Sequence, residues 1–254
     1  MKRSIKSLIG YTIGATDGEI GKVKEFYFDD ETWTIRYLIV ETGNWLSDRK
    51  VLIAIKNLLT PDWEKNVILL NLTKQQIKNS PDIDTEKPVS RQQEIVLNEH
   101  YELENYWNGG FYDGGLPLPM HLPGIKEAVI NKIEGDVHLR STNEIIGYNI
   151  MATDGKIGNV EDFLILDKTW KIDFMVVDTG DWFPGKKVLI SPKWIREIKW
   201  DTSTVIVKAS VEHVKSSPEY DPSQPMSEAD EVKLHNHYDK LIPQFEDKGI
   251  LNTF

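Results

Sequence analysis

Three acidic side chains each recur 137 residues further along the chain, which makes them the first candidates for chemistry. The pairs are Asp17 with Asp154, Asp30 with Asp167, and Glu41 with Asp178. Paired carboxylates can bind a hard cation or act as general acid and base. Each of these, however, stands where a turn favours an Asx side chain, and none belongs to an EF-hand calcium loop. We expect them to serve turns; a hydrolase or metal enzyme remains an alternative, which metal analysis would test.

The histidines do not follow a known metal-ligand spacing. They are His100, His121, His138, His213, His235 and His237. His235 and His237 are two residues apart on a predicted helix, so their rings face different sides, whereas a zinc-binding helix needs a spacing of four. The chain has no cysteine and no phosphate loop or nucleophile elbow. We therefore predict no catalytic residue, no metal site and no cofactor, and a protein that is not an enzyme.

Tryptophan is the third residue type to weigh, because six of the eight recur in register. They pair as Trp33 with Trp170, Trp45 with Trp182, and Trp63 with Trp200. Packing in a small core or turn is one interpretation. The other concerns Trp45 and Trp182, which follow Thr-Gly in a polar loop and could anchor a partner, since aromatic residues are enriched at binding hot spots. We predict partner-binding residues at these loops and in the connector, namely Trp45, Trp182, Trp107, Phe111 and Tyr112.

All of these pairs belong to one tandem duplication. A shift of 137 residues lays Arg3 to Tyr101 on Arg140 to Tyr238 without a gap, and roughly 38 of 99 positions are identical. The sequence therefore predicts a first repeat at residues 1–101, a connector rich in Gly, Pro and aromatics at 102–138, and a second repeat at 139–254. A module used twice in one chain is more typical of binding or assembly than of catalysis.

Short strands joined by Gly and Asp turns must position these residues. Alternating apolar residues predict strands at 22–28, 35–40, 50–53 and 67–72, and at their copies 137 residues later. Gly21 and Gly158 predict a bulge or a close backbone approach. Helices are predicted at 73–79 and 91–106, with copies at 210–216 and 228–241. The fold class is mainly β: two tandem small SH3-like β-barrels, each followed by short helices.

The basic start of the chain could be read as a weak signal peptide. Ile9-Gly10-Tyr11, however, recurs as Ile146-Gly147-Tyr148 inside the chain. An export signal could not act there, so we interpret the segment as a first strand. A second repetition, His100-Tyr101 with His237-Tyr238, predicts a helix that docks in the same way on each barrel.

Composition limits the partners. The net charge is −10 and no basic stripe occurs, so neither direct nucleic-acid binding nor binding to anionic membranes is expected. No run approaches the ~20 apolar residues that span a bilayer, so no membrane insertion is expected. A cytoplasmic location is the default expectation.

Five segments of each repeat resemble the PRC-barrel domain. They are Ile-Gly-Tyr, Ala-Thr-Asp-Gly-x-Ile-Gly-x-Val, Asp-x-Thr-Trp-x-Ile, Val-x-Thr-Gly-x-Trp and Lys-Val-Leu-Ile, over residues 3–85 and 140–222. This domain is shared by the H subunit of purple-bacterial photosynthetic reaction centres, the C-terminal part of the ribosome maturation factor RimM, and many stand-alone proteins. The resemblance implies a small SH3-like barrel that serves as an adaptor or assembly surface, with no family-wide catalytic residues. The chain lacks the transmembrane helix of the H subunit and the other barrel of the ribosome factor.

The leading hypothesis is a non-enzymatic adaptor that binds a protein of unknown identity, with its repeats packed about a pseudo-two-fold axis. Such a chain could also form a homodimer, because surfaces that meet within a chain can meet between chains. One alternative is an accessory factor in RNA or ribosome maturation that acts through a ribosomal protein, which co-purification with ribosomal particles would test. Another is a soluble relative of the reaction-centre H subunit that regulates a membrane complex.

Overall fold

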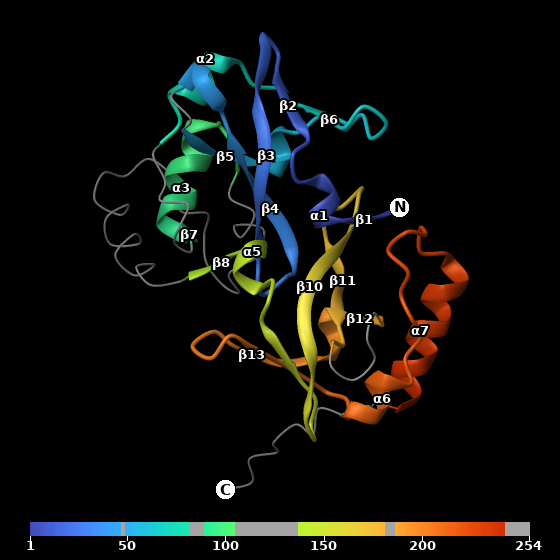
Figure 1. Ribbon diagram of the computed structural model, residues 1–254. Coiled ribbons are helices and arrows are strands. Elements are labelled where there is room, and N and C mark those ends of the chain that lie inside the picture. Colours follow the sequence, from blue (N-terminus) through green and yellow to red (C-terminus); the bar gives the residue numbers. More distant parts are fainter. Residues whose placement is uncertain (47–48, 82–88, 105–136, 181–185, 242–254) are drawn as a thin grey trace, which may run out of the picture. The chain divides into compact units, whose positions relative to one another are not determined.

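The computed structural model describes residues 1–46, 49–81, 89–104, 137–180 and 186–241 (Figure 1). It is mainly β and has two compact units. The N-terminal unit consists of Ser7–Asn143 and Thr169–Lys171. The C-terminal unit consists of Met1–Lys6, Glu144–Lys168 and Ile172–Phe254. The boundaries of the units therefore differ from those of the sequence repeats, because each unit includes a short piece from the opposite repeat.

The N-terminal unit contains one sheet in the order β5-β4-β3-β2-β6, and β8 pairs with both β3 and β7. The neighbours are antiparallel except β2 and β6, which are parallel. The described elements are α1 (Ile5–Leu8), β2 (Thr12–Ala15), β3 (Gly18–Asp29), β4 (Thr34–Glu41), β5 (Lys50–Ala54), β6 (Val67–Leu69), α2 (Lys74–Lys78), β7 (Val89–Ser90), α3 (Arg91–His100) and β8 (Val137–Ser141), with 3-10 turns η1 (Gly43–Leu46) and η2 (Ile55–Asn57).

The C-terminal unit repeats this arrangement in a sheet of order β12-β11-β10-β9-β14-β13, to which β1 adds by pairing with β10. Its described elements are β1 (Lys2–Ser4), α5 (Thr142–Ile145), β9 (Asn149–Met151), β10 (Lys156–Leu166), β11 (Ile172–Asp178), β12 (Lys187–Ile190), β13 (Ile195–Lys199), β14 (Thr204–Val207), α6 (Val211–Lys215) and α7 (Glu228–Leu241), with the 3-10 turn η4 (Pro192–Trp194).

Most predicted strands and helices form where the periodicity placed them. The start of each repeat differs: residues 2–4 are a strand, but Ile5–Leu8 is a helical turn, and Gly10 then takes φ +86°. Strand β13 was not predicted. Strand β8 begins at Val137, within the last two residues of the predicted connector, and residues 105–136 of that connector lie outside the described residues.

The core of each unit is built on one central strand that is apolar on both faces. In β4, the four residues from Tyr37 to Val40 are all buried, and their copies from Phe174 to Val177 in β11 are buried as well. A strand buried on both sides must be covered on both. Part of this cover comes from the long helices, because Tyr37 contacts Glu94 on α3 and Phe174 contacts His235 on α7.

The two long helices dock on their units in the same manner. Glu94 and Leu97 on α3 are buried, as is Tyr101 directly after it. Their copies on α7 have the same spacing along one helical face, with Leu234 and Tyr238 buried and Glu231 one-third exposed. The ring Nε2 of His100 lies 2.8 Å from the carbonyl oxygen of Gln76. The ring Nε2 of His237 lies 2.7 Å from the carbonyl oxygen of His213, the residue equivalent to Gln76. The predicted common docking is confirmed.

Each unit takes its first strand from the opposite repeat (Figure 1). Strand β1 pairs antiparallel with β10, placing Ser4 opposite Leu164. Strand β8, its copy, pairs antiparallel with β3, placing Ser141 opposite Tyr27. The two registers coincide under the shift of 137 residues, so the exchange is reciprocal. We call the receiving edges the first-strand slots: residues 162–167 in the C-terminal unit and 25–30 in the N-terminal unit.

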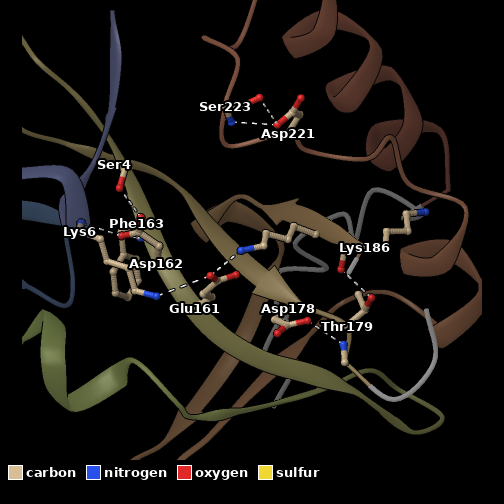
Figure 2. A network of polar contacts seen from close by, with 12 residues as sticks. Ser4, Lys6, Glu161, Asp162, Phe163, Asp178, Thr179, Lys186, Asp221 and Ser223 are labelled. Carbon is tan, nitrogen blue, oxygen red and sulfur yellow. Dashed lines mark hydrogen bonds and ion pairs between the residues drawn. The ribbon is translucent and has the colours of Figure 1, made fainter. Parts of the chain in front are cut away.

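Side chains hold the first strand in its slot (Figure 2). In the C-terminal unit, the Ser4 hydroxyl donates to the Asp162 carboxylate, which also accepts from the backbone N–H of Lys6 at 3.1 Å. Arg3 Nε lies 3.4 Å from Asp167 Oδ2. Lys6 and Lys187 both reach Glu161, at 3.6 and 2.6 Å. The first strand and the turn after it are thus held by carboxylates on β10 and by Asp167 directly after it.

Burial raises the pKa of Asp162, although the Ser4 hydroxyl and two backbone N–H groups act against this effect. A folded-state pKa above the unfolded value of 3.8 means that the stability contribution is complete below 3.8 and is lost as pH rises through the folded pKa. We expect the Asp162→Asn chain to gain stability relative to the natural chain as pH rises from about 4 to 7. Urea unfolding across this range measures the slope of the difference.

The matched control for this slope is Asp221. Hydrogen bonds from the Ser223 hydroxyl and the Ser223 backbone N–H lower the pKa of the exposed Asp221. The stability contribution of Asp221 is therefore complete above the unfolded pKa of 3.8 and is lost only below it, so the Asp221→Asn difference is expected to stay nearly flat from about pH 4 to 7. A difference for Asp162→Asn that is as flat as that for Asp221→Asn, or that falls as pH rises, contradicts the prediction.

Candidate protein-binding site

The loop that carries Trp45 is closed at its base by a threonine. The backbone N–H of Thr42 donates to the carbonyl oxygen of Arg49 at 3.1 Å, and the Thr42 hydroxyl donates to the same oxygen at 2.7 Å. The copy is equivalent, because Thr179 bonds the carbonyl oxygen of Lys186 through its N–H at 3.3 Å and its hydroxyl at 2.8 Å. Both repeats therefore fix the two stems of this loop in the same way.

Trp45 is half-buried and held on two sides. Its indole N–H donates to the carbonyl oxygen of Ile20 on β3. The Lys74 ammonium lies 5.5 Å from the centre of the Trp45 ring, within reach of a cation–π interaction. The ring lines a broad, open hollow of about 410 Å³ formed by residues 19–22 and 41–45, which we call the Trp45 hollow. An aromatic side chain at the surface is thus already ordered in the free protein.

The helix beside this loop, α2, is held at both ends by side chains from the barrel. Asp17 Oδ1 accepts from the backbone N–H of Lys74 at 2.8 Å. At the other end, the Arg49 guanidinium donates to the carbonyl oxygens of Lys78 and Ser80 at 3.0 and 2.7 Å. Anions at a helix N-terminus and cations at its C-terminus both complement the unpaired backbone groups there. Loop and helix are therefore tied into one surface.

The second repeat ties α6 in the same way. Asp154 Oδ1 accepts from the backbone N–H of Val211 at 2.7 Å. The Lys186 ammonium donates to the carbonyl oxygens of Lys215 and Ser217 at 2.6 and 3.0 Å. The role of these residues has been kept in both repeats even where Lys has replaced Arg.

Replacing Asp17 or Asp154 by alanine is expected to lower the free energy of unfolding by about 1 kcal/mol, because the first N–H of the helix loses its acceptor. Urea unfolding measures the loss. Asp17→Asn serves as the matched control, since its amide oxygen can still accept and should keep most of the stability. An alanine variant as stable as the asparagine variant would contradict the role of the carboxylate oxygen.

The two repeats differ in sequence at one residue that contacts Trp45. Val211 occupies the position equivalent to Lys74, so this residue carries a charge in the first repeat alone. Around the Trp45 hollow, exposed Glu19 and Glu41 alternate with exposed Lys22. A mixed charge pattern of this kind suits polar contacts with a protein and does not provide the basic track that a phosphate backbone requires.

The other predicted partner-binding residues stay predictions. Trp182, Trp107, Phe111 and Tyr112 lie outside the described residues. The packing interpretation of tryptophan is confirmed for Trp33 and Trp170, which are 9% and 8% exposed and both take positive φ in their turns.

The repeated carboxylates have structural partners, but mostly not within their own turns. Asp178 does serve its own turn, accepting from the Gly180 N–H at 2.8 Å. Asp17 and Asp154, in contrast, reach a helix 57 residues away. Asp30 and Asp167 pair with Arg140 and Arg3 on the exchanged strands, each at 3.4 Å. Within the described ranges, no group of three or more His, Asp or Glu side chains could hold a metal ion.

Sequence reasoning missed the residues that fix this surface. Arg49 and Lys186 keep a cation in both repeats, and Arg3-Ser4 recurs as Arg140-Ser141 at the first positions of the overlay. These identities were the available signals.

A second concavity, of about 240 Å³, lies between residues 218–226 and α7 in the C-terminal unit.

Comparison with known families agrees with this architecture. A family model described as the PRC-barrel domain matches residues 2–77 and again residues 138–214, which together make up more than half of the chain. Each match runs from a first strand to the helix that Asp17 or Asp154 caps. No match was found among the curated proteins. Within the described residues, no helix combines the length and apolar character needed to cross a membrane. The chain belongs to the PRC-barrel family and carries two PRC-barrel domains in tandem.

Proposed function

We propose that the chain is a non-catalytic adaptor that binds a protein partner through the Trp45 hollow. The observation that carries the proposal is the fixed position of a half-exposed indole. The bond to Ile20, the Lys74 ammonium and the closed loop base all order Trp45 before any partner arrives. An anchor that is already ordered loses little side-chain entropy on binding, and aromatic anchors dominate many protein interfaces.

The shape and charge of the hollow support a protein partner over a small substrate. Sites for small molecules enclose most of their ligand, whereas the Trp45 hollow is wide and open. Of the acidic groups in and near it, Glu41 lies 3.8 Å from the Lys24 ammonium, and Asp17 caps α2. A role as adaptor without a reactive centre is therefore the proposal that fits this surface best.

Trp45→Ala is expected to weaken partner binding by more than roughly tenfold, which corresponds to about 1.4 kcal/mol. The partner is first identified by affinity capture and mass spectrometry, and its Kd is then measured with the purified proteins. Trp182→Ala tests the equivalent loop in the same assay. Trp63→Ala removes another half-buried indole outside the hollow and serves as the control. Unchanged Kd for a folded Trp45→Ala chain would reject the hollow as the binding site.

A further inference from the structure

The two first-strand slots share one set of Arg and Ser contacts with their strands. Arg3 pairs with Asp167 at 3.4 Å, and its copy Arg140 pairs with Asp30 at 3.4 Å. The Ser4 hydroxyl donates to Asp162. In the C-terminal slot, the Arg and Ser side chains of the strand therefore each contact one carboxylate of the slot. The N-terminal unit repeats the hydroxyl contact, because Ser141 donates to Glu25.

The backbone follows the same equivalence. The Asp167 N–H donates to the carbonyl oxygen of Met1 at 3.1 Å, and the Asp30 N–H donates to that of His138 at 2.9 Å. These contacts therefore do not depend on whether the strand and the slot belong to the same molecule. The Arg and Ser donors of a first strand are complementary to the carboxylate acceptors of the slot.

After each first strand, the chain passes from one unit to the other at an equivalent point. The boundary falls between Lys6 and Ser7 in the first repeat and between Asn143 and Glu144 in the second. Both boundaries lie inside a single four-residue helical turn, α1 or α5. Such a turn is a short hinge, and short hinges between an exchanged element and its domain favour exchange between molecules.

The two strands are not held equally firmly. Strand β8 pairs with β3 and with β7, whereas β1 has β10 as its pairing partner in the described part of the sheet. The buried side chains of Glu94 and His138 add a contact at 3.1 Å to β8. Strand β1 is held instead by ion pairs whose carboxylates are all partly exposed to water: Lys2 with Glu231 and Asp173, and the Met1 ammonium with Asp167. Strand β1 is therefore the one that can leave its slot at the lower cost.

We propose that the C-terminal first-strand slot also accepts β1 of a second copy of this chain, giving a dimer in which the two copies exchange β1. The strand makes the same bonds with the slot in this dimer as in the single chain, so the two forms differ mainly in the effective concentration of the strand at the slot. A strand that belongs to the same molecule as the slot has an effective concentration on the order of millimolar. The single chain prevails in dilute solution and the dimer becomes populated near that concentration.

A charge swap tests the proposal. In the Arg3→Asp chain and in the Asp167→Arg chain, the strand meets its own slot with like charges, which is unfavourable. When the two chains are mixed, each strand finds a slot of opposite charge on the other chain. We expect native mass spectrometry and light scattering to show a mixed dimer at least roughly tenfold more abundant than either homodimer. The double variant Arg3→Asp/Asp167→Arg restores opposite charges at positions 3 and 167 within one chain, although the Met1 ammonium loses its contact with Asp167, and it should remain as monomeric as the natural protein.

Circular dichroism follows each single variant. If one of them is unfolded alone, mixing should restore both its fold and the dimer. Mixing that yields no dimer, or a double variant that dimerises as strongly as the mixture, overturns the proposal.

An independent measurement uses the absence of natural cysteines. Lys2 and Leu166 face each other across the slot. A tagged Lys2→Cys chain is incubated at about 1 mM with an untagged Leu166→Cys chain and oxidised. We expect a mixed disulfide in roughly tenfold excess over a control with Lys65→Cys, whose side chain is 78% exposed and lies outside the slot. Equal yields from the two mixtures would overturn the proposal. This experiment leaves the Arg-Ser contacts unchanged, so it is independent of the charge swap.

Discussion

Replacing Gly21 with alanine is expected to lower the free energy of unfolding by about 3 kcal/mol. A Cβ at this position would lie 2.0 Å from the carbonyl oxygen of Glu41 and 2.9 Å from the Cα of Thr42. Both atoms belong to the backbone of the neighbouring strand and its loop, so they cannot move aside as a flexible side chain could. Gly158 meets Asp178 and Thr179 in the same way, with a closest approach of 2.0 Å, and the same loss is expected for Gly158→Ala.

Gly43→Ala is the matched control in the same loop. Gly43 has φ +61°, and a Cβ there would have open space around it. The expected loss of about 1 kcal/mol comes only from the left-handed backbone conformation. Urea unfolding monitored by tryptophan fluorescence and circular dichroism compares the three chains. Gly21→Ala and Gly43→Ala losses of equal size would show that close approach is not the reason for this glycine.

The Glu94→Ala chain is expected to lose about 3 kcal/mol as well, for a different reason. Glu94 is fully buried, and its carboxylate accepts from the Tyr37 hydroxyl at 3.0 Å and lies 3.1 Å from His138 Nε2. Asn98 Oδ1 lies 3.1 Å from the same hydroxyl. Alanine would remove an acceptor from polar groups that stay away from water, and it would leave a cavity.

Glu231→Ala is the matched control in the second repeat. Glu231 is the copy of Glu94 but is one-third exposed and contacts Lys2, so a loss of at most about 1 kcal/mol is expected. Hydrogen exchange locates the effect: the amides of β8 and of residues 27–29 in β3 should exchange faster in Glu94→Ala. Equal losses for both variants, or unchanged exchange in β8, would contradict the assigned role of the buried group.

The close approach at Gly21 and Gly158 was predictable because a glycine kept at one position in two diverged copies requires a reason in the backbone. The strands from 34 to 41 and from 172 to 178 were predictable from alternation, and the helix from 228 to 241 from its cap and periodicity. In each case the signal lies within a short stretch of sequence, where periodicity and turn chemistry act directly.

The parts that could not be predicted depend on partners far away in sequence. Asp17 looked like a turn residue because it follows a turn pattern, but its acceptor oxygen serves a helix 57 residues later. The recurrence of Ile9-Gly10-Tyr11 as Ile146-Gly147-Tyr148 indicates a strand at the start of each repeat and contains no information about which sheet edge receives it. The exchange of first strands therefore cannot be predicted, and neither can the helical turn at Ile5–Leu8, which is too short to show a period.

The crossed first strands also bear on how the chain behaves when its backbone is broken. Residues 1–4 complete the sheet of the C-terminal unit, and residues 137–141 complete the sheet of the N-terminal unit. If the chain were cleaved between α3 and β8, each of the two fragments would thus still contain a strand that belongs to the other fragment's sheet.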